Sequence, residues 1–529
     1  MSIGDRDDWM MREIARGAMN RREFIQLSIA TGLSVVAAER AFAAAAPPKK
    51  GGTFKMASGY GATKDTLDPA TWRDPFNADV GQILGNCLVS IDQTNAVQPD
   101  LAESFEPSDG AKKWAFKLKK GVSFHNGKSL GADDVVATFN YHRNPKSKSV
   151  IRSALVDILD VKADGPETVI VTLRDPNADF PYVVSDFHLP IFAAKDGGID
   201  FASGVGTGPF VLEKFEPGAK LTAKRNPDYH HSEGPWFDEI ELSSIADAGA
   251  RQNALLSGQV HYIDRVDLRQ VAALKRRREI KVTDVTGFGH YVAPMNCMAK
   301  PFDDLNVRQA IKYAINRDDL VHRVLYGFGA PGDDNPISPA LRFAVSPEPK
   351  YKYDPEKAKA LLKASGITTL KVDLSASDVA FPGALDAAYL MKASAHKAGI
   401  EINVIKEPPD SYWDVVWMKK PWSVSYWSGR TTVDAMFSTA YAADAMWNDT
   451  FWTNTKFNDL LKAARAELDD KKRADMYTEM QQIVHDDGGA VVLMFNDFVA
   501  AHSAKLAHGD LNSNAEHDGG LIFQRWWMA

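Results

Sequence analysis

The sequence predicts an α/β protein with mixed sheets flanked by helices and with more than one domain. Residues 371–375, 384–398 and 401–405 favour, in turn, a strand, a helix and a strand, a succession typical of a partly parallel sheet. Residues 114–127 alternate between polar and apolar up to an Asn-Gly pair, which predicts an antiparallel hairpin. A chain of 529 residues, 45% of them hydrophobic, can fill the cores of two or three domains.

An export signal is expected over residues 1–43. Arg21 and Arg22 precede an apolar run at 24–38, which is too short to span a bilayer comfortably. Small residues ending at Ala43 suit signal peptidase, so the mature protein is expected to be free in the periplasm. The paired arginines resemble a twin-arginine signal, and an ordinary secretory signal is the alternative.

The amino-terminal half of the mature chain begins with a strand at residues 51–57, followed by a loop that carries Tyr60. A helix is predicted to start at residue 132, because the two acidic residues in its first turn suit the positive end of the helix dipole. Residues 206–210 place two glycines around a threonine before a proline, which predicts a tight backbone turn.

Amphipathic helices dominate the carboxyl-terminal half. Residues 307–315 carry apolar side chains at the i, i+3, i+4 spacing of a helix with one buried face. Another helix is predicted to open at Asp354, a capping residue followed by proline, and to end at Gly366. Further helices are predicted at 412–418, 457–468 and 472–484, and a buried strand at 491–495.

Composition and isolated residues argue against several classes of function. The net charge of −7, without basic runs, disfavours a nucleic-acid partner. No nucleophile-elbow, metalloprotease or phosphate-loop motif occurs, so no catalytic residue is assigned. His125 and the pair His230 and His231 lack a third ligand at helical or strand spacing, so neither a metal nor a cofactor is expected. Cys87 and Cys297, the only cysteines, leave a disulfide open.

Several motifs follow one another in a recognisable order. They are GGTFKMA at 51–57 with TLDPA at 66–70, PDLAESF at 99–105, GTGPF at 206–210 and PFDDLNVRQA at 301–310. In this order they resemble the peptide and nickel class of periplasmic solute-binding proteins, which serve ABC importers. The resemblance covers nearly all of the mature chain. It implies a type II periplasmic binding protein with two lobes and an additional inserted domain, three domains in all.

The resemblance also implies domain boundaries. Domain I is expected to be discontinuous and to combine residues 51–84, 207–286 and 498–529, whereas domain II takes 85–206 and domain III 287–497. A chain that leaves a domain and returns to it crosses at least twice, and such crossings act as hinges. The solute is therefore expected in a cleft between lobes that close over it.

The stretch 422–437 is the expected centre of the solute site, because a predicted strand ends there in Trp427 and Arg430. An indole offers a stacking surface, and a guanidinium requires an anionic or carbonyl partner. In peptide-binding relatives this position carries an aspartate that holds the ligand's amino group, so Arg430 implies an anionic solute group instead. Alternatively, Trp427 belongs to the core. Asp434 either neutralises Arg430 or contacts an amino group of the solute.

Three further residues are candidates for the solute site. The resemblance implies that Tyr60, on the first domain's loop, and Asn296, at the strand into the third domain, face the same cleft. Trp413 lies four residues before Trp417, a spacing that suits helix packing as well as a pocket.

The predicted function is the binding component of an ABC importer, which captures a peptide-like, opine-like or other polar organic solute without altering it. Its partners would be the solute and the importer's permease and ATPase, and the protein is expected to be a monomer. The alternatives are an exported enzyme, such as a hydrolase, and a chemosensory co-receptor on the same scaffold.

Overall fold

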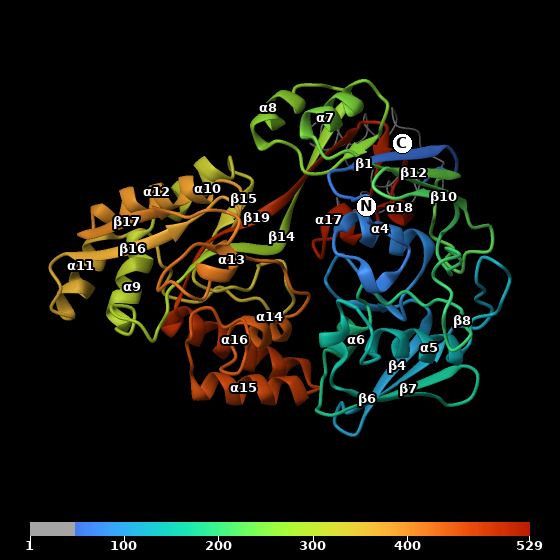
Figure 1. Ribbon diagram of the computed structural model, residues 1–529, viewed down its shortest axis with the longest axis horizontal. Helices are drawn as coiled ribbons and strands as arrows, with labels where there is room; N and C mark the ends of the chain where they lie inside the picture. Colours follow the sequence, from blue (N-terminus) through green and yellow to red (C-terminus); the bar gives the residue numbers. More distant parts are fainter. Residues whose placement is uncertain (1–47) are drawn as a thin grey trace, which may run out of the picture.

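The computed structural model describes residues 48–529 and shows two lobes joined by a pair of long strands (Figure 1). The expected export signal, residues 1–43, lies outside the described residues. The predicted α/β class with mixed sheets is confirmed. Within 48–529, no helix combines the length and the apolar character needed to cross a lipid bilayer.

One nine-stranded sheet runs through both lobes. In spatial order it contains β10 (Phe210–Glu216), β11 (Lys220–Arg225), β12 (Glu239–Ser244), β1 (Thr53–Ser58), β13 (Tyr262–Ile263), β19 (Ala490–Ser503), β14 (Ile280–Pro294) and β18 (Ser425–Trp427), with β15 (Gly329–Pro331) also paired to β19. Strands β14 and β19 are the crossing strands, and they pair with each other along most of their length.

The pairing of the two crossing strands breaks between the lobes. Thr286 pairs with Asp497 and His290 with Phe495, so the register shifts at residues 287–289. A bulge of this kind bends a strand and increases its local twist. The shift coincides with the boundaries predicted at 286/287 and 497/498. The three-domain division itself stays a prediction.

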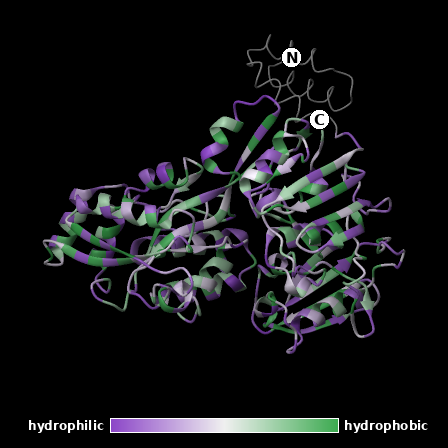
Figure 2. Ribbon diagram, turned by 45° about the horizontal axis from the view of Figure 1, so that its top comes forward, coloured by the Kyte–Doolittle hydropathy of each residue, from purple (hydrophilic) through white to green (hydrophobic). Residues whose placement is uncertain are grey.

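The first lobe contains the amino-terminal strand β1 and a separate four-stranded sheet in the order β4-β5-β7-β6. Buried and more exposed residues alternate along β5 (Lys113–Leu118), at the start of the predicted hairpin stretch, and Figure 2 shows such alternation along the strands of this lobe. An antiparallel bridge between Ser123 and Ser129 closes the predicted Asn-Gly turn. This lobe's remaining elements are α4 (Pro75–Leu84), β2 (Val89–Ile91), β3 (Val97–Pro99), β4 (Ala102–Ser108), β5 (Lys113–Leu118), α5 (Ala132–Arg143), β6 (Ile158–Ala163), β7 (Thr168–Leu173), α6 (Phe180–Val183), β8 (Ala194–Lys195), β9 (Gly198–Ile199), α7 (Ala248–Leu256), α8 (Val271–Leu274), β20 (Leu506–Ala507), α17 (Glu516–Gly519), α18 (Ile522–Arg525), β21 (Trp527–Met528) and the 3-10 turns Pro69–Thr71, Arg152–Leu155 and Leu268–Gln270.

The second lobe confirms the predicted strand-helix-strand unit, because β16 and β17 are parallel. Its elements are α9 (Leu305–Ala314), α10 (Arg317–Val324), α11 (Pro355–Ala364), β16 (Leu370–Ala376), α12 (Ala384–His396), β17 (Ile400–Lys406), α13 (Tyr412–Val415), α14 (Val433–Ala440), α15 (Thr455–Ala466) and α16 (Asp470–Asp487). Asp354 caps α11 as predicted, and its side chain accepts from the Lys357 amide. The helix expected at 412–418 is wrong in extent, since α13 ends at Val415 and Met418 takes a left-handed backbone.

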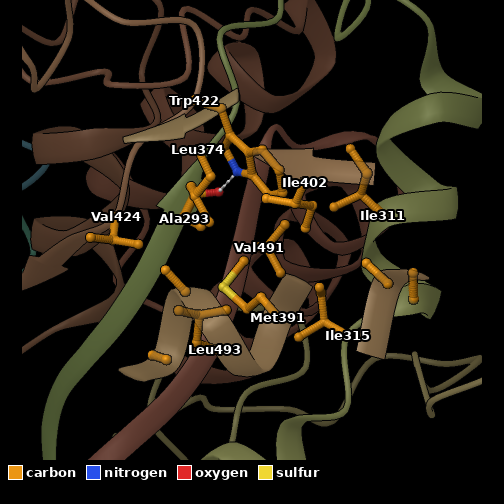
Figure 3. Close-up of a cluster of buried hydrophobic side chains, with 14 of the residues drawn as sticks. Ala293, Ile311, Ile315, Leu374, Met391, Ile402, Trp422, Val424, Val491 and Leu493 are labelled. Atoms are coloured by element: carbon orange, nitrogen blue, oxygen red, sulfur yellow. Dashed lines mark hydrogen bonds between the residues drawn. The ribbon is translucent and has the colours of Figure 1, made fainter. Parts of the chain in front are cut away.

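The second lobe is held by a buried hydrophobic core beside β14 and β19. Trp422 lies in this core and donates its indole N–H to the Ala293 carbonyl at 3.2 Å (Figure 3). Burial of such side chains fixes the strand that leads to the expected site. Cys87 and Cys297 are both free thiols, so no disulfide joins them.

Candidate functional site

A cavity of about 400 Å³ lies between the lobes, beside the crossing strands. Tyr60 and Arg265 line it from the first lobe, and Tyr291 and Pro382 from the second. A second cavity of about 350 Å³ shares Glu516 with the first. Solute sites of two-lobed proteins occupy such clefts, so these cavities are the candidate site.

Tyr60 and Arg265 form one unit on the first lobe. The Tyr60 hydroxyl donates to Glu516 Oε1 at 2.8 Å, and the Arg265 guanidinium lies 4.7 Å from the centre of the Tyr60 ring. Burial and the Glu516 carboxylate raise the pKa of Tyr60, so the phenol stays a donor. Among residues 48–529 Arg265 forms no ion pair, and its side chain is exposed to the cleft.

A buried ionic network lies next to Tyr60 and Glu516 in the first lobe. His517 Nδ1 lies 2.8 Å from Asp79 Oδ2, and His517 Nε2 lies 3.1 Å from Asp264 Oδ2. Although burial opposes the charge, the two carboxylates raise the pKa of His517 well above its ordinary value. The His517 imidazolium therefore links Asp79 on α4 to Asp264, which follows β13. Because Glu516 precedes His517 in the chain, this link also holds the Tyr60 partner in place. His517 itself has a left-handed backbone, with φ at 59°.

The second lobe presents two tyrosines from neighbouring strands. Tyr291 on β14 pairs directly with Tyr426 on β18, so both side chains lie on the same face of the sheet. Burial raises the pKa of Tyr291 to about 12, and the nearby Arg265 charge partly opposes this rise. Tyr426 is 44% exposed. The two rings therefore extend from the first cavity toward the end of β18.

Arg430 lies three residues after the end of this strand, β18. Its Nη1 donates to the carbonyls of Ser428 and Gly429, at 3.1 and 3.3 Å, and it forms no ion pair within the described part of the chain. Partial burial lowers the pKa of Arg430, and Tyr426 lies close enough to oppose that effect. The adjoining Gly429 and Thr431 line the second cavity. A desolvated guanidinium without a carboxylate is suited to bind an anion.

Asp434 has a partner other than Arg430. Both of its carboxylate oxygens lie 3.2 Å from Nε of Arg465, and the carboxylate is buried. The alternative in which Asp434 neutralises Arg430 is therefore not what the structure contains. Because the Asp434 carboxylate is already paired, Arg430 keeps its charge for another ligand.

Of the predicted site residues, Tyr60 alone lines a cavity; Arg430 lies beside the second cavity without lining it, and Asp434 and the other three line neither. Trp427 is 6% exposed and packs against Trp417 and Trp447 at ring-centre distances of 6.2 and 6.4 Å. Trp413 is 36% exposed and meets Tyr426 edge to face at 5.7 Å. Asn296 closes a turn by accepting the Met298 amide at 2.9 Å. Their contact with solute stays a prediction.

Arg265, Glu516 and Tyr426 were missed in the sequence. Tyr426 lies within the stretch expected to form the site, and its exposure follows from strand alternation with the buried Trp427. Arg265 and Glu516 are 251 positions apart in a chain that brings them to one wall, and no local motif marks either residue.

Comparison with known proteins agrees with this architecture. The family model "Bacterial extracellular solute-binding proteins, family 5 Middle" matches residues 96–449, more than half of the chain. The dipeptide-binding protein of Escherichia coli (strain K12) is 28% identical over 442 residues, which cover 76% of this chain and 81% of that protein.

Two solved structures extend the likeness over nearly the whole chain. The periplasmic binding protein AgaA of A. tumefaciens R10, in complex with agropinic acid, has a TM-score of 0.71 at 25% identity and covers 90% of this chain and 99% of its own. The ABC transporter-associated periplasmic binding protein DppA of Helicobacter pylori, in complex with the peptide STSA, has a TM-score of 0.70 at 25% identity, with coverage of 91% and 98%. The chain thus belongs to the bacterial extracellular solute-binding proteins of family 5, the binding components of ABC importers for peptides and other solutes.

Proposed function

We propose that this protein captures a polar organic solute bearing an anionic group, peptide-like or opine-like, and delivers it to the permease of an ABC importer. The observation that carries the proposal is a pair of guanidiniums, Arg265 on one lobe and Arg430 on the other. Neither has a carboxylate partner among residues 48–529.

Electrostatics favours an anion over an amine at this site. A guanidinium repels an ammonium and binds a carboxylate or phosphate with two parallel hydrogen bonds. Tyr291 lies near Arg265 and its cross-strand neighbour Tyr426 lies near Arg430, so both phenols can donate to a solute held by the two cations. The agropinic acid complex of AgaA supports an acidic organic solute, and the STSA complex of DppA supports a peptide-like one.

The crossing strands supply the means of closure. A register shift between Thr286 and His290 gives the two lobes a bendable junction. Solute contacts on both lobes would stabilise the closed state, which a permease and its ATPase read as the loaded form. We place this event in the periplasm, after cleavage near Ala43, and expect a monomer without catalytic residues.

A calorimetric screen of the mature protein tests the proposal. The screen would compare acidic opines and acidic peptides with their neutral amides. Charged hydrogen bonds are worth about 1.5–3 kcal/mol each, so Arg430→Gln and Arg265→Gln should each weaken binding roughly tenfold to a hundredfold. Arg269→Gln is the matched control, because Arg269 is exposed and already paired with Asp267 at 2.8 Å.

Two outcomes would refute parts of the proposal. Unchanged affinity in Arg430→Gln would remove that residue from the site. Equal affinity for acids and their amides would remove the anionic group from the definition of the solute. Recovery of the solute chemically unaltered is expected from a binding protein, whereas turnover would favour the exported enzyme.

A further inference from the structure

His230 and His231 gain a third polar partner in the fold. The loop between β11 and β12 carries both histidines against Asp100, which is far from them in sequence. Asp100 Oδ1 lies 3.0 Å from His230 Nε2 and 2.8 Å from His231 Nε2. We propose that Asp100, His230 and His231 form a binding site for a divalent transition-metal ion of the Zn²⁺ type.

The geometry suits such an ion. One ligand atom from each of the three side chains lies within 4.8 Å of the other two. Zinc bonds to imidazole nitrogen and carboxylate oxygen are about 2.0–2.2 Å long, which separates tetrahedral ligands by roughly 3.3 Å. The two distances to the Asp100 oxygen need to open by only a few tenths of an ångström.

The surroundings orient the carboxylate ligand. Asn86 Nδ2 donates to the other Asp100 oxygen at 3.1 Å and to the Tyr229 hydroxyl at 2.9 Å. Carboxylate ligands of metals are commonly fixed by such outer hydrogen bonds. His230 Nδ1 is buried and has no hydrogen-bond partner among the described residues. With three protein ligands, the fourth position stays open for water, as in zinc sites that exchange ligands.

Access to the site comes from the His231 side. The side chain of His231 is 34% exposed, whereas those of His230 and Asp100 are 7% and 9% exposed. Asp100 also borders the second cavity, but neither histidine lines either cavity. The proposed metal site therefore differs from the guanidinium site in its residues, its charge and its ligand.

A purely structural cluster is the alternative, in which the two neutral imidazoles donate hydrogen bonds to Asp100 and no ion binds. Titration of the metal-stripped mature protein with Zn²⁺, followed by calorimetry, separates the two cases. The proposal requires one Zn²⁺ per chain, and Co²⁺ in its place should give the visible absorption of a site with nitrogen and oxygen ligands.

Matched variants show whether Zn²⁺ binds at Asp100, His230 and His231. His231→Gln removes a partly exposed ligand and should weaken Zn²⁺ binding by more than about tenfold. His322→Gln is the control, because His322 is exposed on α10 and outside the cluster, and it should bind like the unmodified chain. Asp100→Asn keeps the side chain's shape, removes its charge and should also weaken binding.

Absence of stoichiometric Zn²⁺ binding would overturn the proposal. Equal affinity in the unmodified chain, His231→Gln and Asp100→Asn would overturn it as well, since the ion would then bind elsewhere. Circular dichroism of each variant shows that it is folded before its affinity is compared.

Discussion

Replacing His517 should weaken the wall that supports Tyr60 and Glu516. His517 is the cation between the buried carboxylates of Asp79 and Asp264. The informative substitution is His517→Asn, because asparagine tolerates the left-handed backbone found at this position better than most residues. The variant therefore removes the charge without adding much backbone strain.

The loss of folding free energy depends on which carboxylate is left without a cation. Asp264 keeps Arg251, whose Nε lies 3.3 Å from Asp264 Oδ1, and a 2.7 Å hydrogen bond from the Ser58 hydroxyl. Asp79 keeps no cation among the described residues and is fully buried. Breaking a buried pair by removing one partner costs about 3–5 kcal/mol. We expect the free energy of unfolding to fall by that amount.

The loss should depend on pH. The folded-state pKa of His517 is raised above the unfolded value of about 6.5. A group with a raised folded pKa contributes its full stability below the unfolded pKa, and that contribution is lost as pH rises through the folded pKa. The difference between the natural chain and His517→Asn should be largest near pH 6 and should shrink at alkaline pH.

Thermal unfolding measures this difference. For a domain of 150–250 residues, each kcal/mol moves the midpoint by about 2–4 °C, so a fall of roughly 6–20 °C is expected. His322→Asn, on an exposed face of α10, should stay within about 0.5 kcal/mol of the natural chain. A midpoint for His517→Asn that equals the control at pH 6 would refute the ionic role of His517.

Two further substitutions test the turn at Gly206 and the crossing strands. Gly206→Ala should lower the free energy of unfolding by about 1–3 kcal/mol, because the new Cβ would lie 1.9 Å from the Leu84 carbonyl oxygen. Gly509→Ala is the control, since its Cβ meets nothing within 4 Å. Equal chemical-denaturation midpoints for the two variants would contradict this prediction. Burial and the neighbouring Asp284 raise the pKa of Asp497 to about 7. The protonated Asp497 therefore contributes its full stability below the unfolded-state pKa, and this contribution is lost as the pH rises through about 7. Asp497→Asn should flatten that pH dependence of the melting temperature, and an unchanged slope would exclude the carboxyl pair as its source.

Local signals were sufficient where one helix or strand is decided by its own residues. The capping Asp354 and the left-handed Gly366 bracket α11 as predicted, because both signals act within one turn of the helix. The strand predicted at 491–495 is only the first part of β19. Its continuation through Asp497 is polar, and pairing with β14 decides it, which no local pattern reveals.

The candidate site was predictable only in part, because most of its side chains come from segments that are distant in the sequence. Arg430 was noticeable because a strand end, a glycine and a cation are adjacent in sequence. The partner of Asp434 is Arg465, on a different helix, so the sequence left that pairing open. Arg265 and the Asp100 cluster depend on contacts between distant segments, and only the fold brings those side chains together.

The proposed placement of one cation on each lobe has a consequence for closure. Arg265 lies near Tyr291 and Arg430 lies near Tyr426, so closing the lobes without solute would bring two like charges together. Under the proposed function, an anionic solute would remove that repulsion and would contact both lobes only in the closed state. A ligand shifts a conformational equilibrium only by its differential affinity for the two states. A neutral solute of the same shape would leave the repulsion in place, so selectivity for anions and coupling to closure would come from the same two side chains.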